Sequence, residues 1–284
     1  MPTRLVAPCA SITGRPIPTS LKRSSSSQPK KNCSRGCASD REVPVGERPL
    51  SPTHVSALLR ADLHVHTDTS PDSLLSPRRL VALCLRRGIQ CLAITDHNRL
   101  QGAWEVAQVA PNGLWVIVGE EVRTAQGEML GLFLTAEVPP GLSAVETAAR
   151  IRAQGGLVGL PHPRDRFRSV VPPETVQALA EASLLDFLEG RNGRVMLSQD
   201  NREAEAWGRA LGRPLSAGSD AHCALELGRC GVWLPPFDGP QGFLRALEQA
   251  VLWGRESPAW VHLSSMLARV RRISRVDRHL TPER

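Results

Sequence analysis

The stretch ADLHVHT, residues 61–67, combines an apolar run with two histidines. We predict a strand over Ala61–Val65, the first of several short apolar runs in the chain. His64 and His66 are two residues apart, so on an extended strand both imidazoles point to the same side and can reach one cation. The stretch therefore predicts a strand that presents a pair of metal ligands.

Six further apolar runs follow along the chain, and helical stretches separate them. Continuously apolar runs of this length favour strands that are buried on both faces, as in a parallel sheet covered by helices. A hairpin is expected around Gly127. The fold class predicted from this order is α/β, either a barrel or an open doubly wound sheet. The further runs are Ile89–Thr95, Leu114–Val118, Met129–Leu134, Leu157–Leu160, Leu184–Leu188 and Pro214–Ala217.

Two of the helices are marked by capping residues. Ser143, with Glu146 three residues later, forms a capping box for a helix that begins at the next residue. Asp200 or Asn201 is expected to start another helix, which ends at Gly212. No G-x-G-x-x-G or G-x-x-x-x-G-K-[ST] motif follows a predicted strand, so a nucleotide-binding fold has no support from motifs.

Polar side chains follow nearly every predicted strand at its carboxyl end. In a (βα) barrel these ends meet at one rim, where the active sites of such barrels are assembled. Five histidines and at least three acids exceed the needs of a single ion, and a bridging carboxylate can hold two cations about 3.5–4 Å apart. Mixed imidazole and carboxylate ligands suit Zn, Mn or Fe. The residues concerned are Asp62, His64, His66, Asp96, His97, Glu120, Glu121, His162, Asn192, Asp220 and His222.

Four motifs, in this order along the chain, resemble those of the PHP domain family, named for polymerase and histidinol phosphatase. They are DLHVHT at 62–67, TDHN at 95–98, LPHP at 160–163 and GSDAH at 218–222. The resemblance spans about Arg60 to Leu234, and the short linkers look most like the small stand-alone phosphoesterases of the family. It implies a distorted (βα)7 barrel with two or three divalent metal ions.

The resemblance also implies which residues hold these ions. The first ion would be bound by His64, His66, Glu121 and Asp220, the second by Glu121, His162 and Glu128, and the third by Asp72, His97 and His222. Glu121 is chosen over Glu120 because the family has a G-x-E spacing, here after Gly119. The family often has a histidine where Glu128 stands, and a glutamate can still ligate.

The chemistry implied by the resemblance is phosphate ester hydrolysis by a metal-bridged hydroxide. Asp62 and Asp96 stand beside ligands, and we interpret them as acceptors that fix imidazole orientation. Arg168 and Arg191 follow predicted strands, and we predict that they bind the phosphate through bidentate contacts. The expected substrate is a nucleoside bisphosphate, the 5′ end of a short nucleic acid, or another small phosphomonoester.

Two other functions remain open at this point. One is a metal-binding PHP module without catalysis, against which the retention of every ligand position except Glu128 argues. The other is a C–N hydrolase of the amidohydrolase type, which the arginines beside His162 disfavour.

The net charge of +7 suggests a nucleic-acid partner until the charges are located. Residues 1–39 contain seven basic residues and no acid, so residues 40–284 hold 28 basic and 28 acidic residues and sum to zero. The body of the chain is therefore not a basic surface, and its attraction to phosphate is expected to come from metal ions and a few arginines.

The expected organisation has three parts. Residues 1–54, rich in Ser, Pro and basic residues, form a disordered tail. The PHP domain occupies residues 55–267, and a basic segment follows over 268–284. Within that segment we expect Arg269–Arg278 to form an exposed basic helix.

No apolar run approaches the roughly 18 residues of a membrane span, so no membrane partner is expected. The seven cysteines form no CxxC pair, and their odd number favours a reducing compartment. The expected location is the cytoplasm, or an organelle if residues 1–39 act as a transit peptide. The oligomeric state is left open.

Overall fold

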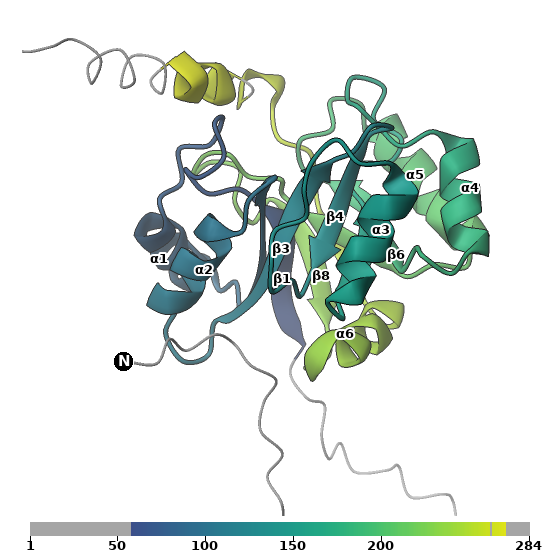
Figure 1. Cartoon of the computed structure of the whole chain (residues 1–284). Coiled ribbons are helices and arrows are strands. Elements are labelled where there is room, and N and C mark those ends of the chain that lie inside the picture. The colour runs from purple at the N-terminus through teal and green to yellow at the C-terminus, as the bar shows by residue number, and fades with distance from the viewer. Residues whose placement is uncertain (1–57, 262, 271–284) are drawn as a thin grey trace, which may run out of the picture. The chain divides into compact units, whose positions relative to one another are not determined.

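The structure, a computed structural model, describes residues 58–261 and 263–270 (Figure 1). The predicted tail over 1–54 lies outside the described residues, and so does the predicted basic segment beyond residue 270. The predicted boundary between residues 267 and 268 falls inside a helix that runs over 263–270.

The strands of the described chain form one nine-stranded sheet. They are β1 (Leu59–Val65), β2 (Cys91–His97), β3 (Trp115–Arg123), β4 (Glu128–Leu132), β5 (Leu157–Leu160), β6 (Phe187–Asn192), β7 (Leu215–Gly218), β8 (Cys230–Leu234) and β9 (Val251–Gly254). Their order across the sheet is β7-β6-β5-β4-β3-β2-β1-β8-β9. Strand β4 is antiparallel to both β3 and β5, because the predicted hairpin around Gly127 reverses the chain.

The sheet closes almost completely between its first and seventh strands. Just beyond β7, Ala221 forms a parallel bridge with Val65 of β1. The amide of Asp220 donates to the carbonyl of His64 at 2.7 Å, and the amide of His66 donates to the carbonyl of Ala221 at 3.1 Å. The predicted α/β barrel of the distorted (βα)7 type is therefore confirmed, with β4 reversed within it.

A glycine permits this closure. A Cβ atom at Gly218 would lie 2.4 Å from Cβ of His64 and 2.5 Å from its backbone nitrogen. Real Cβ atoms do not approach so closely, so β7 can reach β1 only because residue 218 has no side chain.

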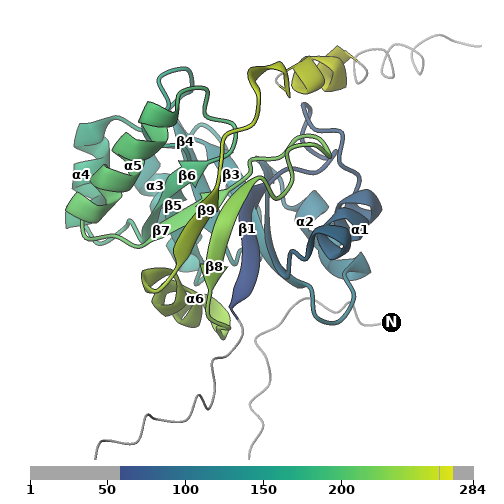
Figure 2. The ribbon, with the colours of Figure 1, turned by 180° about the vertical axis from the view of Figure 1, so that it is seen from behind.

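The last two strands lie outside the ring. The first half of β1 pairs with β8 in antiparallel fashion, and β8 pairs with β9 (Figure 2). Along one edge of β1, the first residues therefore pair with β8, and Val65 at its end pairs with Ala221, just beyond β7.

Helices cover the sheet. They are α1 (Pro77–Arg87), α2 (Gln101–Val109), α3 (Ala144–Ala153), α4 (Pro173–Glu181), α5 (Ser198–Ala210) and α6 (Gly239–Glu248), followed by a short 3₁₀ helix, Ala259–Val261, and the helix over 263–270. Figure 1 shows α1 and α2 on one side of the sheet and α3, α4 and α5 on the other. The Ser143 half of the predicted capping box is confirmed at α3, where its hydroxyl accepts a hydrogen bond from the amide of Glu146. The Glu146 side chain accepts a hydrogen bond from Arg150.

The apolar core has three parts, and one of them fills the ring of strands. There Phe187 and Leu63 are buried together with Phe243 of α6. Gly159 makes room for Phe187, because a Cβ atom at residue 159 would lie 2.2 Å from that ring. The other two parts lie under α1 and α2 and under α3, α4 and α5. The polar residues at the carboxyl ends of the strands are thus supported by a packed apolar interior.

Each predicted apolar run overlaps a strand, and two details were wrong or missed. Helix α5 begins at Ser198, two residues before the predicted start, and Asp200 and Asn201 lie buried in its first turn. Strands β8 and β9 were not predicted as strands. No helix of residues 58–261 and 263–270 has the length and apolar character needed to cross a membrane.

Candidate metal centre

Four ligand atoms from three strand ends gather at the rim of the barrel. Nε2 of His64 and Nε2 of His66 are 3.1 Å apart, and they lie 3.5 and 3.4 Å from Oε2 of Glu121. Oδ1 of Asp220 is 3.2 Å from Nε2 of His66 and 3.8 Å from Nε2 of His64. We call these four residues the first ligand group. All four residues are buried.

These separations fit a metal ion better than they fit hydrogen bonds alone. Bonds of about 2.0–2.1 Å to nitrogen and oxygen place the ligand atoms of a tetrahedral zinc site about 3.3 Å apart. Among the described residues, the buried oxygens Oε2 of Glu121 and Oδ1 of Asp220 have no hydrogen-bond partner. A buried carboxylate oxygen without a partner is costly, and a divalent cation would satisfy it. The first ligand group therefore fits the metal that the sequence predicted.

The other two predicted ligand groups also come together. In the second ligand group, Nε2 of His162 lies 3.1 Å from Oε1 of Glu121 and 3.7 Å from Oε2 of Glu128. Glu121 thus turns one oxygen to each of two groups, as a bridging ligand must. Glu128, where the family often has histidine, stands in place to ligate.

The third ligand group comprises Asp72, His97 and His222. Oδ1 of Asp72 is 3.4 Å from Nε2 of His222, and Oδ2 of Asp72 is 3.7 Å from Nε2 of His97. Nδ1 of His97 also lies 3.0 Å from Oε2 of Glu121, so this imidazole borders all three groups. All nine predicted ligands therefore belong to one continuous cluster.

The electrostatics of the cluster hold the carboxylates of Glu121 and Asp220 ionised. Burial alone would raise the pKa of Glu121 and of Asp220. The imidazoles around Glu121, and the Arg168 guanidinium and His64 beside Asp220, outweigh burial and hold both pKa values well below their ordinary range. Burial and the neighbouring His222 and His97 lower the pKa of His66, which favours the neutral form that a ligand needs.

Backbone strain is stored at two ligands. His162 has φ of 31° and Asp220 has φ of 52°, both in the left-handed region that residues with a Cβ atom rarely adopt. Each such residue costs on the order of 1–3 kcal/mol and persists only where surrounding contacts hold it. The amide of Asp220 is held by the His64 carbonyl, and the amide of His162 by Oε2 of Glu189 at 2.8 Å.

Glu189 is a functional residue that the sequence prediction missed. Its Oε1 lies 3.1 Å from Nδ1 of His64, and its Oε2 also accepts a hydrogen bond from the Asn192 side chain at 2.9 Å. Burial opposes protonation of His64, but the carboxylates of Glu189, Asp220 and Glu121 hold its pKa well above the ordinary value. Glu189 directly follows the predicted run Leu184–Leu188, so the rule that strand ends carry the site could have found it.

Asp62 and Asp96, which we interpreted as acceptors that fix imidazole orientation, accept hydrogen bonds from backbone amides and hydroxyls rather than from the imidazoles themselves. Asp62 accepts from the amide and hydroxyl of Ser219 and from the amide of Gly228. It therefore fixes the loop that carries Asp220 and His222. Burial raises the pKa of Asp62 to about 6, against these hydrogen bonds.

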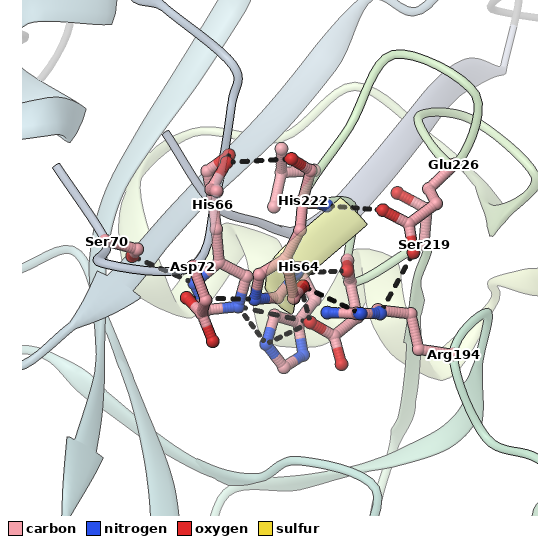
Figure 3. Close-up of polar contacts among 12 residues, drawn as sticks. His64, His66, Ser70, Asp72, Arg194, Ser219, His222 and Glu226 are labelled. Carbon is pink, nitrogen blue, oxygen red and sulfur yellow. Dashed lines mark hydrogen bonds and ion pairs between the residues drawn. The ribbon is translucent and has the colours of Figure 1, made fainter. Parts of the chain in front are cut away.

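Asp96 acts through a hydroxyl. It accepts from the amide and hydroxyl of Thr67 and from the hydroxyl of Ser70 at 2.6 Å. The same Ser70 oxygen lies 3.3 Å from Nδ1 of His66 (Figure 3). Asp96 thus orients the ring of His66 through Ser70, because the loop after β1 folds back between them.

The two predicted arginines have different positions. Arg168 lies in the cluster, where its NH1 nitrogen donates to Oδ2 of Asp220 at 2.6 Å. Arg191 does not: its guanidinium donates to the Gly254 carbonyl at 3.2 Å and lies 3.8 Å from Glu205. The prediction for Arg191 is corrected, because its neighbours Glu189 and Asn192 are the residues of β6 that face the ligands.

The fold and the donor set together define an α/β barrel whose rim gathers residues that could hold metal ions. The family model "PHP domain" matches residues 62–204, and the model "PHP-associated" matches residues 198–252. Uncharacterized protein MJ1587 of Methanocaldococcus jannaschii is 40% identical over 116 residues, which cover 37% of this chain and 68% of that protein. The chain belongs to the PHP domain family.

Solved structures share the fold at low sequence identity. A two-domain protein from Bacteroides vulgatus, described as containing a predicted PHP-like metal-dependent phosphoesterase, aligns with a TM-score of 0.58 at 20% identity. The match covers 74% of this chain and 70% of that one. An amidohydrolase from Chromobacterium violaceum aligns with a TM-score of 0.51 at 18% identity, over 68% of this chain and 97% of that one.

Proposed function

We propose that this protein is a metal-dependent phosphoesterase that hydrolyses the ester of a small phosphorylated molecule or of a short nucleic-acid end. The observation that carries the proposal is the partly buried contact between Arg168 and Asp220, which puts a guanidinium beside the first ligand group. A fixed cation at a carboxylate-rich metal cluster suits an anionic substrate. An uncharged amide, the substrate of a C–N hydrolase, carries no ground-state charge for this guanidinium to bind.

The three ligand groups would hold two or three divalent ions, of Mn, Zn or Fe. When bound, these ions supply Lewis-acid polarisation of the phosphoryl group and a water of lowered pKa. Glu121 spans the groups, and Glu189 and Ser70 keep Nε2 of His64 and of His66 turned toward the cluster. Arg168 contributes donors for the phosphoryl oxygens.

Access to the cluster favours approach of the substrate from one side. The side chains of His97, Glu128 and Arg168 are 22%, 19% and 20% exposed, whereas those of His64, His66 and Glu121 are fully buried. The phosphoryl group would therefore enter beside these three residues.

We also propose a cytoplasmic location and no membrane partner. The four described cysteines, Cys84, Cys91, Cys223 and Cys230, are free thiols, which fits a reducing compartment.

The proposal is tested by metal analysis and a substrate screen of the full chain. Phosphomonoesters, nucleoside 3′,5′-bisphosphates, 5′-phosphorylated oligonucleotides and small amides are offered with added Mn²⁺. We expect hydrolysis of a phosphate ester, and we expect His64→Ala to lower the bound metal and to reduce kcat/KM by at least about 100-fold. Gln177→Ala on the exposed face of α4 is the control.

Two results would contradict the proposal. Hydrolysis confined to amides would assign the chain to the C–N hydrolases. Bound metal with no hydrolysis of any offered ester, in wild type and variant alike, would favour a metal-binding module without catalysis.

A further inference from the structure

The helix over 263–270 lies at the rim of the barrel, at the end toward which β1 runs (Figures 1 and 2). One side of it is buried, since Ser265 and Ala268 are 8% and 4% exposed. Leu263 and Met266, on the other side, are each 63% exposed. The helix is therefore docked on the domain by one face.

A buried ion pair ties this helix to the ligands. Arg194 donates through NH2 to the hydroxyl of Ser265 at 3.0 Å, and its Nε lies 2.9 Å from Oε1 of Glu226. The other oxygen of Glu226 accepts from the amides of His222 and Cys223, each at 2.9 Å (Figure 3). The position of the helix and the loop that carries His222 are thus held by the same two side chains.

The docked helix brings one arginine to the cluster. NH2 of Arg269 lies 3.0 Å from Oδ2 of Asp72, in the third ligand group. The side chain of Arg269 is 64% exposed, so its guanidinium faces solvent as well as the carboxylate. Arg168 makes the corresponding contact with Asp220, in the first ligand group. Two guanidinium groups from distant parts of the sequence therefore flank the ligand cluster.

We propose that Arg269 is a substrate-binding residue that donates to the phosphoryl oxygens of the bound ester, as a second arginine beside Arg168. The inference rests on the proposed function and adds to it a residue outside the segment that the two family models match. A guanidinium presents N–H donors in a fixed fork that matches phosphate, and its contact with Asp72 holds it at the exposed side of the cluster, where His97 is accessible.

This role changes the interpretation of the basic end of the chain. Arg269 was expected to start an exposed basic helix over Arg269–Arg278, of which residues 271–278 lie outside the described residues. Arg269 is the last residue but one of the helix over 263–270 and contacts the predicted ligand Asp72, so that helix forms part of the proposed substrate site.

The test compares Arg269→Ala and Arg269→Lys with the wild type, as full-length chains loaded with Mn²⁺. Arg209→Ala is the control, because Arg209 is an exposed arginine of α5 that pairs with Glu205 and its loss makes the same charge change. The measurements are the Kd of inorganic phosphate by calorimetry, KM and kcat for p-nitrophenyl phosphate, and bound metal per chain.

We expect Arg269→Ala to raise the phosphate Kd and KM by about 10- to 100-fold, as the loss of a charge-assisted hydrogen bond does. Bound metal should equal that of the wild type. Arg269→Lys should recover part of the loss, because it keeps the charge without the fork, and Arg209→Ala should change the phosphate Kd less than about twofold. Ser265→Ala, which loosens the docked helix, should raise KM by a smaller factor.

Unchanged phosphate Kd and KM in Arg269→Ala would overturn the inference, and ester hydrolysis by that variant would leave the phosphoesterase function standing. A loss of bound metal that accounts for the weaker phosphate binding would also overturn it, by assigning Arg269 to support of Asp72. A wild type that binds metal but neither binds phosphate nor hydrolyses any ester would instead reject the proposed function itself, and this inference with it.

Discussion

Glu189 supports the candidate metal centre although it belongs to none of the three ligand groups. Its carboxylate contacts Nδ1 of His64 and holds the amide of His162, so it supports two ligand groups at once. A carboxylate on the far nitrogen of a ligating imidazole orients the ring and raises its basicity. The order of the ligands could be predicted from their motifs, and the place of Glu189 at a strand end from the same rule, but its contact with His64 could not, because no motif spacing links the two residues.

We predict that Glu189→Gln weakens metal binding by about 10- to 100-fold while the fold is kept. Glutamine can still accept from the amide of His162, but it lacks the charge that raises the pKa of His64. The measurement is competition for Mn²⁺ or Zn²⁺ with a chromophoric chelator, alongside circular dichroism. Glu146→Gln, on the exposed face of α3, is the control. Equal metal affinity in Glu189→Gln and the wild type would contradict the positioning role.

At the scale of elements, the geometry of the rim depends on β1, whose side chains do not simply alternate between the two faces of the strand. Leu63 and Val65 should share a face of a regular strand, yet Leu63 packs inside the ring and Val65 packs under α1 and α2. The pairing of β1 with β2 shifts register between Asp62 and Val65, and such bulges re-aim side chains beside active sites.

The sequence therefore predicted the strands well and their details less well. Apolar runs marked β1 to β7 because strands buried on both faces need them. Strands β8 and β9 were missed because they lie outside the ring and include exposed residues such as Trp233 and Val251. The bulge in β1 and the early start of α5 depend on long-range contacts, which sequence periodicity does not reveal. In α5, Arg166 pairs with Asp200 in the first turn of the helix.

The contact between β7 and β1 provides a prediction for these elements. Gly218→Ala should lower stability by about 1–3 kcal/mol or more, because the added methyl group meets the backbone of His64 and neither strand can move without disturbing the ligands. Gly242→Ala is the control: the new Cβ atom there meets its nearest neighbour at 3.7 Å, and alanine favours the helix. Urea denaturation measures both. A Gly218→Ala variant as stable as Gly242→Ala would show that the closure tolerates a side chain.

At the scale of the whole molecule, the ligands join strands that are far apart in the sequence. The first ligand group takes residues from the end of β1, from β3 and from the loop after β7, so a bound metal ion would tie the ring together at the point where β1 meets β7. Metal binding and folding should therefore be linked.

We predict that chelation lowers the melting temperature by about 5–10 °C relative to protein with Mn²⁺ at about 100 times its Kd. That concentration corresponds to about 2.7 kcal/mol of stabilisation. Calorimetric melting with EDTA and with excess Mn²⁺ measures the shift, and His64→Ala should show little of it. If the wild type melted at the same temperature in both conditions, the ions would not contribute to the stability of the barrel.

The closure of the ring by residues just beyond β7 also sets the order in which the centre can be made. His64, His66 and Glu121 leave the ribosome before Asp220, which follows Glu121 by 99 positions. Until then the nascent chain has three of the four ligands of the first group, and the strand pairing that brings the fourth to His64 cannot form. The fourth ligand of the first group is therefore added only after strands β1 to β7 have all been synthesised.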